Sequence, residues 1–199
     1  MRVLIACEFS GRVRDSFRQR GHESWSCDLE PSEGIFKNYH IIGNCLEILD
    51  GINNKPRDLL IAHPPCTYLS NSGVRWLYKN KTRDETRWQK MILAAEFFNQ
   101  LLNAPIDKIA IENPIIHKYA KEIVKENYKQ IIQPWYFGHG ETKSTCLWLK
   151  NLPKLIPTKM IFNHNNRIHS APDSKGRQKE RSRTYLGIAR AMADQWGKL

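Results

Sequence analysis

Cys66 stands in a stiff loop, directly after the apolar run 59–62 and the prolines Pro64 and Pro65. Proline fixes its own φ at about −65° and has no amide hydrogen, so this pair ends a strand and holds the next side chain in place. A thiol held at the tip of a buried strand can act as a nucleophile. The alternative interpretation is a space-filling role, because free cysteine is one of the most commonly buried residue types.

Three acidic residues end other predicted strands in the same way. Glu8 follows the run 3–7, Asp28 follows 23–27 and Glu112 follows 108–111. In open α/β sheets ligands bind outside the carboxyl ends of the strands, so these carboxyl groups and Cys66 are expected to face one cavity. There a thiolate can add to one carbon of an electron-poor ring while an acid donates a proton to a ring nitrogen.

Asp28 comes about twenty residues after the first turn, a spacing typical of the acid that binds a cofactor ribose. Gly11 is the single glycine of that turn, so the G-x-G-x-x-G fingerprint of pyrophosphate cofactors is absent. An adenosine ligand without phosphates, such as S-adenosylmethionine, needs the turn and the acid but no phosphate cradle. The other interpretation of Asp28 is an acid that starts a solvated turn.

Apolar runs and helical spacings alternate along the chain. Strands are expected at 3–7, 23–27, 41–44, 58–62, 108–111, 128–134 and 145–149, and helices at 12–20, 88–102 and 184–196. This alternation favours a single α/β domain over 1–199, with a doubly wound and mostly parallel sheet. The proline-interrupted stretch 150–183 shows neither a helix nor a strand pattern. It is expected to be either a flexible basic loop or an arm that orders when it grips phosphates.

The chain of 199 residues has 31 Lys and Arg against 20 Asp and Glu, a formal net charge of +11. This excess favours a polyanionic partner, and nucleic acid is the expected one. The five dispersed cysteines form no C-x-x-C pair and are not at metal-ligand spacing from the histidines, so neither a disulfide framework nor a metal site is expected. Structural or phosphate-facing roles are expected for the histidines. The N-terminal apolar segment is too short for a signal peptide or a membrane span. A reduced, soluble, cytoplasmic protein is therefore expected.

With these residues in this order, the chain resembles the cytosine-C5 DNA methyltransferase family, in particular its short phage-type members. In that family the nucleophile lies in a Pro-Cys-Gln loop with a serine three residues after the glutamine. Pro65, Cys66 and Ser70 match this motif, and Thr67 stands in place of the glutamine.

Two further segments extend the resemblance. The family's acid lies in a Glu-Asn-Val motif. Glu112 and Asn113 match its first two residues, and Pro114 stands in place of the valine. The family's Tyr-Gly-x-Pro-Gln-x-Arg-x-Arg segment corresponds to 137–145, with Lys143 and Thr145 at the two arginine positions. The second of those arginines supports the target base in the family, and the large target-recognition domain of the family is replaced here by the basic stretch 150–183.

The resemblance implies a role for each part of the site. The residues implied to be catalytic are Cys66, Glu112 and Asn113, without a metal. Those implied to bind S-adenosylmethionine are Glu8, Phe9, Ser10, Gly11, Asp28, Asn44 and Pro64. Those expected to contact DNA are Ser70, Arg75, Lys143, Thr145, Lys175, Arg177, Arg181 and Arg183.

The implied function is S-adenosylmethionine-dependent methyl transfer to C5 of a cytosine flipped out of DNA, through a covalent bond between Cys66 and C6. It would serve DNA methylation or restriction-modification in a bacterial or phage-infected cell. Two alternatives stay open: modification of another pyrimidine, and a DNA-binding protein of this fold without turnover. The segment 76–88, rich in aromatic and cationic residues, is either a lid that closes over DNA or an ordinary amphipathic helix. The target sequence, the strandedness of the DNA and the oligomeric state do not follow from the sequence.

Overall fold

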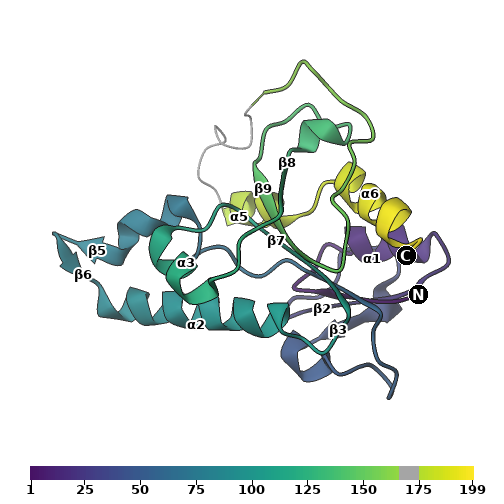
Figure 1. Cartoon of the computed structure of the whole chain (residues 1–199), viewed down its shortest axis with the longest axis horizontal. Helices are drawn as coiled ribbons and strands as arrows, with labels where there is room; N and C mark the ends of the chain where they lie inside the picture. Colours follow the sequence, from purple (N-terminus) through teal and green to yellow (C-terminus); the bar gives the residue numbers. More distant parts are fainter. Residues whose placement is uncertain (166–174) are drawn as a thin grey trace.

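A seven-stranded sheet forms the centre of the computed structural model, which describes residues 1–165 and 175–199 without the side chains of 175, 177 and 178 (Figure 1). The strand order is β3-β2-β1-β4-β7-β9-β8. The strands are β1 Arg2–Ala6, β2 Glu23–Asp28, β3 His40–Ile42, β4 Leu59–Ala62, β7 Lys108–Asn113, β8 Gln130–Ile132 and β9 Thr145–Lys150. Neighbouring strands pair in parallel, apart from β9, which is antiparallel to both β7 and β8. The predicted doubly wound, mostly parallel α/β sheet is confirmed.

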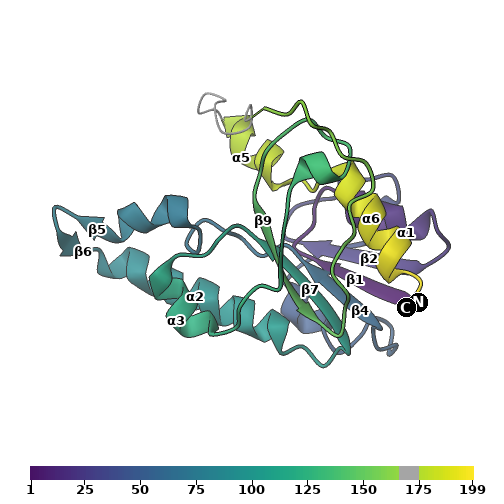
Figure 2. The ribbon, with the colours of Figure 1, turned by 45° about the horizontal axis from the view of Figure 1, so that its top comes forward.

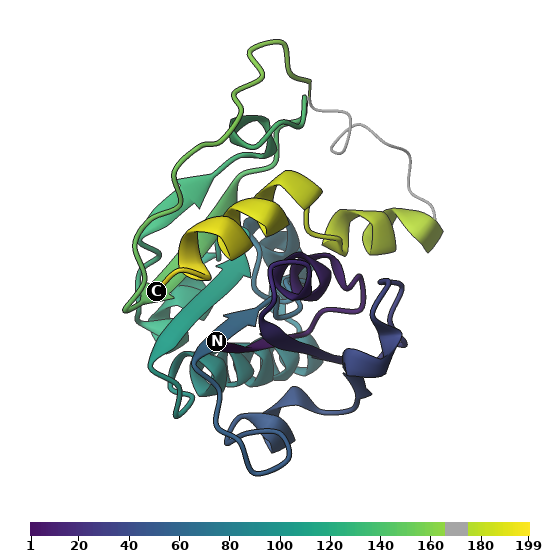
Figure 3. The same cartoon turned by 90° about the vertical axis from the view of Figure 1, so that its right-hand side faces the viewer.

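Helices cover both faces of this sheet (Figures 1 and 3). They are α1 Arg12–Arg18 and α6 Leu186–Trp196 on one face, and α2 Glu85–Leu102 and α3 Lys118–Val124 on the other. Successive strand residues alternate between the faces, so Val3 packs in the cluster of Phe17 and Met192, while Leu4 packs in the cluster of Phe98. Strands buried on both faces are apolar throughout, which explains why continuous apolar runs predicted them.

A small β-hairpin extends from the body beside the start of α2 (Figures 1 and 2). It consists of β5 Tyr78–Lys79 and β6 Thr82–Arg83, and it follows the 3₁₀ helix η3 Asn71–Leu77. Of the two interpretations of 76–88, an ordinary amphipathic helix over the whole segment is therefore wrong. Helix α2 begins only at Glu85, because the Asp84 carboxylate accepts the Arg87 N–H at 2.9 Å and caps it. The other 3₁₀ helices are η1 Lys37–Tyr39, η2 Cys45–Ile48 and η4 Pro134–Tyr136.

The stretch 150–183 contains a helix that the sequence did not reveal, α5 Lys175–Ser182. Its Lys, Arg, Gln and Glu residues are good helix formers, but they leave no apolar stripe that a periodicity would detect. Ion pairs hold it to the loop after β2: Lys179 Nζ lies 2.9 Å from Glu30, and Arg183 Nε, just beyond the helix, lies 2.7 Å from Glu33. The expectation of no regular structure was wrong here because these partners are about 150 residues away in the chain. Of the expected arm, residues 166–174 lie outside the described residues.

Candidate active site

A cavity of about 1040 Å³ opens at the carboxyl ends of β1, β2, β4 and β7. Its floor consists of strand-end residues, among them Cys7, Glu8, Asp28, His63, Cys66, Glu112 and Asn113. Trp76 of η3 and Arg87 of α2 line one side, and Lys179, Arg181 and Thr184 line it from α5 and the segment that follows. The structure thus brings Cys66, Glu112 and Asp28 to one cavity, the arrangement expected from the positions of the strand ends.

The loop that carries Cys66 is tied to the sheet. The Cys66 carbonyl accepts the N–H groups of Leu69 and Ser70 at 3.0 and 2.9 Å, which forms a turn directly after the thiol. The buried Asn113 side chain, at the end of β7, donates its Nδ2 hydrogen to the Pro64 carbonyl at 2.8 Å. Asn113 therefore positions the Pro-Pro-Cys segment relative to β7, and its own Oδ1 has no hydrogen-bond partner among the described residues.

Two cations act on the Cys66 thiol. Burial raises its pKa, whereas the positive charges of Lys143 and Arg181 lower it, and the net direction is upward. Lys143 also donates from Nζ to the Arg181 carbonyl at 2.8 Å, so the two residues are linked. In the resting protein the thiol is protonated, and the two cations would stabilise a thiolate formed beside them.

Glu112, the penultimate residue of β7, is paired with His63. His63 Nδ1 lies 2.8 Å from Glu112 Oε2, and little of either side chain is exposed. Burial alone would raise the pKa of Glu112, but the hydrogen bond and charge of His63, together with Lys143, outweigh it and lower the pKa to about 2. At neutral pH Glu112 is therefore a carboxylate, which accepts hydrogen bonds and does not donate them.

The acid of the first turn, Glu8, serves the start of α1. Its carboxylate accepts the N–H groups of Val13 and Arg14 at 2.7 and 3.2 Å and the Ser10 hydroxyl at 3.3 Å. Burial raises the pKa of Glu8, against the lowering effect of His63 and these N–H donors. A carboxylate in this position satisfies amides that the first turn of a helix leaves unpaired. Glu8 lines the cavity, but most of its hydrogen-bonding capacity is already used.

The backbone conformation of the turn explains why position 11 is a glycine. Its φ is 69°, in the left-handed region, and a Cβ there would lie 2.8 Å from the Gly34 Cα. Glycine is therefore required for the turn that begins α1. Gly11 does not line the cavity; its near neighbours are Gly34 and the Arg14 side chain.

The opposite end of the cavity from Cys66 offers groups that suit an adenosine ligand. Asp28 lies at the end of β2 and lines the cavity, as a ribose-binding acid would. Its Oδ1 also accepts the Glu30 N–H at 3.1 Å, as an acid that starts a turn would, so both interpretations of Asp28 fit. Its second oxygen makes no hydrogen bond to any described residue. Phe9 presents a ring there, with Lys179 Nζ 4.8 Å from its centroid. Asn44 lies apart from the cavity, where its exposed side chain accepts the Leu46 N–H and caps η2.

The residues expected on DNA lie in different surroundings. Ser70, Lys143 and Arg181 line the cavity, and Arg75 is exposed on η3, its guanidinium 4.7 Å from the Trp76 ring. Thr145 is buried at the start of β9, and its hydroxyl donates to the Lys143 carbonyl. Thr145 therefore does not take the place of the family's second arginine in the cavity. The side chains of Lys175 and Arg177, both in α5, lie outside the described residues.

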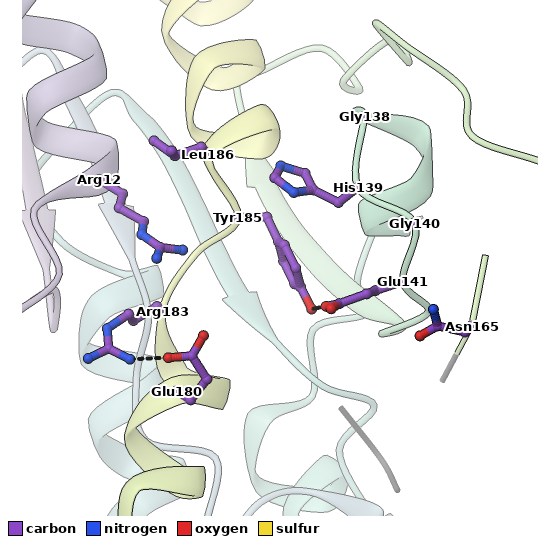
Figure 4. A pocket seen from close by; sticks show the side chains of 10 residues that line it. All are labelled: Arg12, Gly138, His139, Gly140, Glu141, Asn165, Glu180, Arg183, Tyr185 and Leu186. Atoms are coloured by element: carbon purple, nitrogen blue, oxygen red, sulfur yellow. Dashed lines mark hydrogen bonds and ion pairs between the residues drawn. The ribbon is translucent and has the colours of Figure 1, made fainter. Parts of the chain in front are cut away.

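Arg183 belongs to a second, smaller pocket of about 480 Å³ (Figure 4). In this pocket Arg183 pairs with Glu180, and the Tyr185 hydroxyl donates to Glu141. Arg12 also lines it and donates to the Thr184 carbonyl at 2.9 Å. The described residues that line this pocket include no thiol, and its charged side chains are largely paired, so the side chains capable of covalent chemistry lie in the larger cavity.

Sequence reasoning did not include His63 in this site, since structural or phosphate-facing roles were expected for the histidines. His63 directly follows the apolar run of β4, and the rule that located Cys66 and Glu112 at strand ends would have found it too. Among the described residues no group of three or more His, Cys, Asp or Glu is arranged to hold a metal ion. None of the helices in the described part of the chain is both long and apolar enough to cross a membrane.

Comparison with known proteins extends the description of the fold. No protein-family model and no curated protein matches the chain. Among solved structures, a candidate DNA modification methyltransferase encoded within a prophage of E. coli is similar, with 14% identity and a TM-score of 0.50 over 81% of this chain and 52% of that one. The methyltransferase EhMeth of Entamoeba histolytica has 17% identity and a TM-score of 0.48 over 81% of this chain and 57% of its own.

The chain spans little more than half the length of these solved structures. At such low identity, the likeness to the E. coli structure shows the fold alone. Together with the strand order, it establishes that this chain has the doubly wound α/β fold of methyltransferases.

Proposed function

We propose that this protein transfers a methyl group from S-adenosylmethionine to C5 of cytosine in DNA. One observation carries the proposal: a thiol and a carboxyl group from separate strand ends, Cys66 and Glu112, line one cavity with the unshared carboxylate oxygen of Asp28 at its other end. The fold and the positive net charge of +11 support it. The cytosine specificity comes from the motif resemblance around Cys66 and Glu112.

The residues at the Asp28 end fit an adenosyl donor. Asp28 would accept hydrogen bonds from ribose hydroxyls, and the Phe9 ring and Pro64 would contact its apolar parts. Nothing in this end resembles a phosphate cradle, in agreement with a ligand that lacks phosphates. When bound, S-adenosylmethionine supplies an electrophilic methyl group on a sulfonium sulfur.

The protein's own residues would activate the base. Cys66, after losing its proton to water, forms a bond from Sγ to C6 of the flipped cytosine. At the same time N3 takes up a proton that is passed on through the ionised Glu112 carboxylate, which holds no proton of its own at neutral pH. Electron density then gathers at C5, which becomes a carbon nucleophile. After alkylation, C5 loses its proton to water, the bond between Sγ and C6 breaks, and N3 returns its proton. Lys143 and Arg181 would stabilise the thiolate at the beginning and end of this sequence.

The hairpin β5–β6 and η3 form the surface proposed to hold DNA. Residues 78–83 are all exposed, and Trp76, which lines the cavity, is 56% exposed. The hairpin extends away from the body (Figure 2), and it carries the exposed Lys79 and Lys81. Cations beside a stacking ring at the mouth of a cavity suit a flipped nucleotide and its flanking phosphates. In this proposal the hairpin supplies part of the contact that a separate recognition domain supplies in the family.

Covalent trapping tests the reaction directly. DNA with 5-fluorocytosine in place of cytosine should form a complex with the wild-type protein and S-adenosylmethionine that survives denaturing electrophoresis, because fluorine at C5 cannot leave as a proton does. Cys66→Ala should form none, and Cys146→Ala, which removes a buried cysteine of β9 outside the cavity, should still form it. If Cys66→Ala incorporates labelled methyl groups into DNA at the wild-type rate, the proposal is wrong.

A second pyrimidine is favoured by one observation. Glu112 with a pKa of about 2 accepts a hydrogen bond, and N3–H of uracil or thymine would donate one, whereas N3 of cytosine needs a proton. Mass spectrometry of nucleosides from DNA treated with the protein distinguishes the two, since 5-methylcytosine supports the first candidate and another modified pyrimidine the second. If the protein binds DNA but no modified nucleoside forms, the result supports a DNA-binding protein without turnover.

A separate measurement tests the DNA surface. Neutralising Lys79 and Lys81 together should weaken DNA binding and reduce the slope of log affinity against log salt by about two. The matched control neutralises Lys55 and Lys154, which are exposed at the opposite edge of the sheet, near the start of β4 and the end of β9. An unchanged slope in the hairpin variant, or an equal change in the control, would contradict the assignment.

A further inference from the structure

His63 directly follows β4, and its position is determined by the sheet. Its backbone N–H donates to the Ala6 carbonyl of β1 at 3.0 Å. Its Nδ1 lies 2.8 Å from Oε2 of Glu112, and the two side chains are only 9% and 14% exposed. Because both residues belong to central strands or their immediate ends, the contact is part of the folded sheet.

A single hydrogen is shared between His63 and Glu112. An ionised carboxylate accepts hydrogen bonds only, so with Glu112 ionised the hydrogen belongs to Nδ1 of His63. The other ring nitrogen, Nε2, is buried and has no hydrogen-bond partner among the described residues. Buried polar atoms without partners are uncommon in proteins and point to a functional reason for keeping the group there.

The charges that face His63 come from three further elements. They are the Glu112 carboxylate of β7, the Glu8 carboxylate of the first turn, and the Lys143 ammonium between β8 and β9. Burial lowers the pKa of His63, but the bond to Glu112 and the charges of Glu112 and Glu8 outweigh burial and Lys143, so the pKa is raised. The pKa of Glu112 is lowered to about 2. The raised pKa of His63 and the lowered pKa of Glu112 both correspond to an imidazolium beside a carboxylate.

The ion pair of His63 and Glu112 can supply a proton that the proposed chemistry requires. N3 of cytosine needs a proton when the thiolate adds at C6, yet an ionised Glu112 has none to donate. The proton that Glu112 lacks is on its neighbour, 2.8 Å away.

Resting on the proposed function, we infer that His63 is the proton-bearing partner of Glu112 during the reaction at the pyrimidine ring. The Nδ1 proton of His63 moves to Glu112, and the carboxylic acid so formed protonates N3 as the Cys66 thiolate bonds to C6. His63 is then neutral and Glu112 is again ionised. When the bond between Sγ and C6 breaks, the proton returns from N3 through Glu112 to Nδ1. His63 acts through Glu112 and is thus a positioning residue.

Replacing His63 by asparagine tests the proton transfer separately from the hydrogen bond to Glu112. In His63→Asn the amide nitrogen can take the place of Nδ1 and still donate to Glu112, but it cannot release a proton at neutral pH. We expect single-turnover methyl transfer to fall by about 100-fold, in the range of general acid catalysis. The decline of the wild-type rate at high pH, where His63 loses its proton, should vanish. His22→Asn is the control, since His22 precedes β2 at the amino-end edge of the sheet.

A titration that needs no turnover keeps the inference testable. NMR of the protein with labelled histidine should give a raised pKa for His63 in the wild type. Glu112→Gln should bring it below the ordinary value of about 6.5, because burial is then less opposed. Retention of the wild-type rate and pH profile in His63→Asn, or an unchanged His63 pKa in Glu112→Gln, would overturn the inference. Failure of the wild type to methylate cytosine would instead refute the proposed function, and the titration would still decide the pairing.

Discussion

The floor and the roof of the cavity are held in different ways. The floor consists of strand ends whose backbones hydrogen-bond within the sheet, and its side chains are joined by buried contacts such as that of His63 with Glu112. The roof, α5 and the residues after it, is attached mainly by ion pairs that solvent reaches: the side chains of Lys179 and Glu30 are 41% and 56% exposed, and those of Arg183 and Glu33 are 20% and 36% exposed. Ion pairs of this kind each contribute about 0 to 1 kcal/mol. The hydrogen bond from Lys143 Nζ to the Arg181 carbonyl adds a further attachment.

This difference suits the proposed reaction. A flipped nucleotide must enter the cavity and leave it, which needs a cover whose opening costs little free energy. The reacting groups must keep their geometry, which needs anchors whose loss is costly. We therefore expect changes in the floor to reduce the rate of the chemical step, and changes in the roof to alter ligand binding and local stability.

The largest effect is expected from Asn113→Ala in the floor. It removes the bond from Nδ2 to the Pro64 carbonyl and leaves a buried acceptor without a partner. Methyl transfer should fall by about 100-fold through misplacement of Cys66, and the free energy of unfolding by about 1 to 3 kcal/mol. Single-turnover assays and urea denaturation measure the two. Asn103→Ala, which removes an exposed bond of the same type at the end of α2, should change neither, and an equal effect there would contradict the assigned role.

Asp28→Asn should weaken binding of S-adenosylmethionine by about tenfold or more, because a charged acceptor for the ribose is lost. Calorimetric titration with the cofactor or its demethylated product measures this. Asp50→Asn, an exposed carboxylate beyond η2, provides the comparison. If Asp28→Asn binds S-adenosylmethionine with unaltered affinity, Asp28 is not part of the cofactor site.

The pair His63 and Glu112 should make stability depend on pH. The pKa of Glu112, about 2, lies below its unfolded value of about 4.3, so its contribution is present above that value and is lost as pH falls toward 2. The pKa of His63 is raised, so its contribution is present below about 6.5 and is lost as pH rises through the folded-state value. The Tm difference between wild type and Glu112→Gln should therefore be largest between about pH 4.3 and 6.5. A difference that does not vary from pH 3 to pH 9 would count against the ion pair.

The smallest effect on stability is expected in the roof, from Glu33→Gln. This change weakens the contacts of Glu33 with Arg183 and Lys179 and should lower the free energy of unfolding by less than about 1 kcal/mol. Trypsin should nevertheless cut within 175–183 faster than in the wild type, while single-turnover transfer at saturating DNA stays the same. Asp194→Asn, which removes the ion pair between α6 and Arg20, is the control. A loss of chemical rate in Glu33→Gln would show that the roof positions reacting groups.

The elements that sequence analysis located are those whose signal is local. The central strands carry uninterrupted apolar runs because both of their faces are covered, and α6 shows a helical apolar stripe around Ile188 and Met192. Helix α3 was missed: it has seven residues, and its cap is the His117 ring, which accepts the Ala120 N–H. Histidine is an uncommon cap, so no start signal was visible.

The same contrast holds for the site. Cys66, Asp28 and Glu112 were found because a parallel sheet aligns the carboxyl ends of its strands, and this rule needs only the strand positions. Asn44 and Thr145 were placed by motif alignment alone, and both lie away from the cavity, in a cap and in the start of β9. The role of Lys179 at the roof required Glu30 and Phe9, which no local pattern connects to it.

The amino-acid sequence alone determined the α/β class, the approximate position of the strands and most of the groups at their ends, because burial on both faces leaves an apolar record in central strands such as β1 and β4. Only the tertiary structure decided that Glu8 caps α1, that His63 shares a hydrogen with Glu112, and that a charged helix covers the cavity. Those arrangements depend on hydrogen bonds and charges between residues distant in the chain, and their energies arise only when folding brings the partners within a few ångströms.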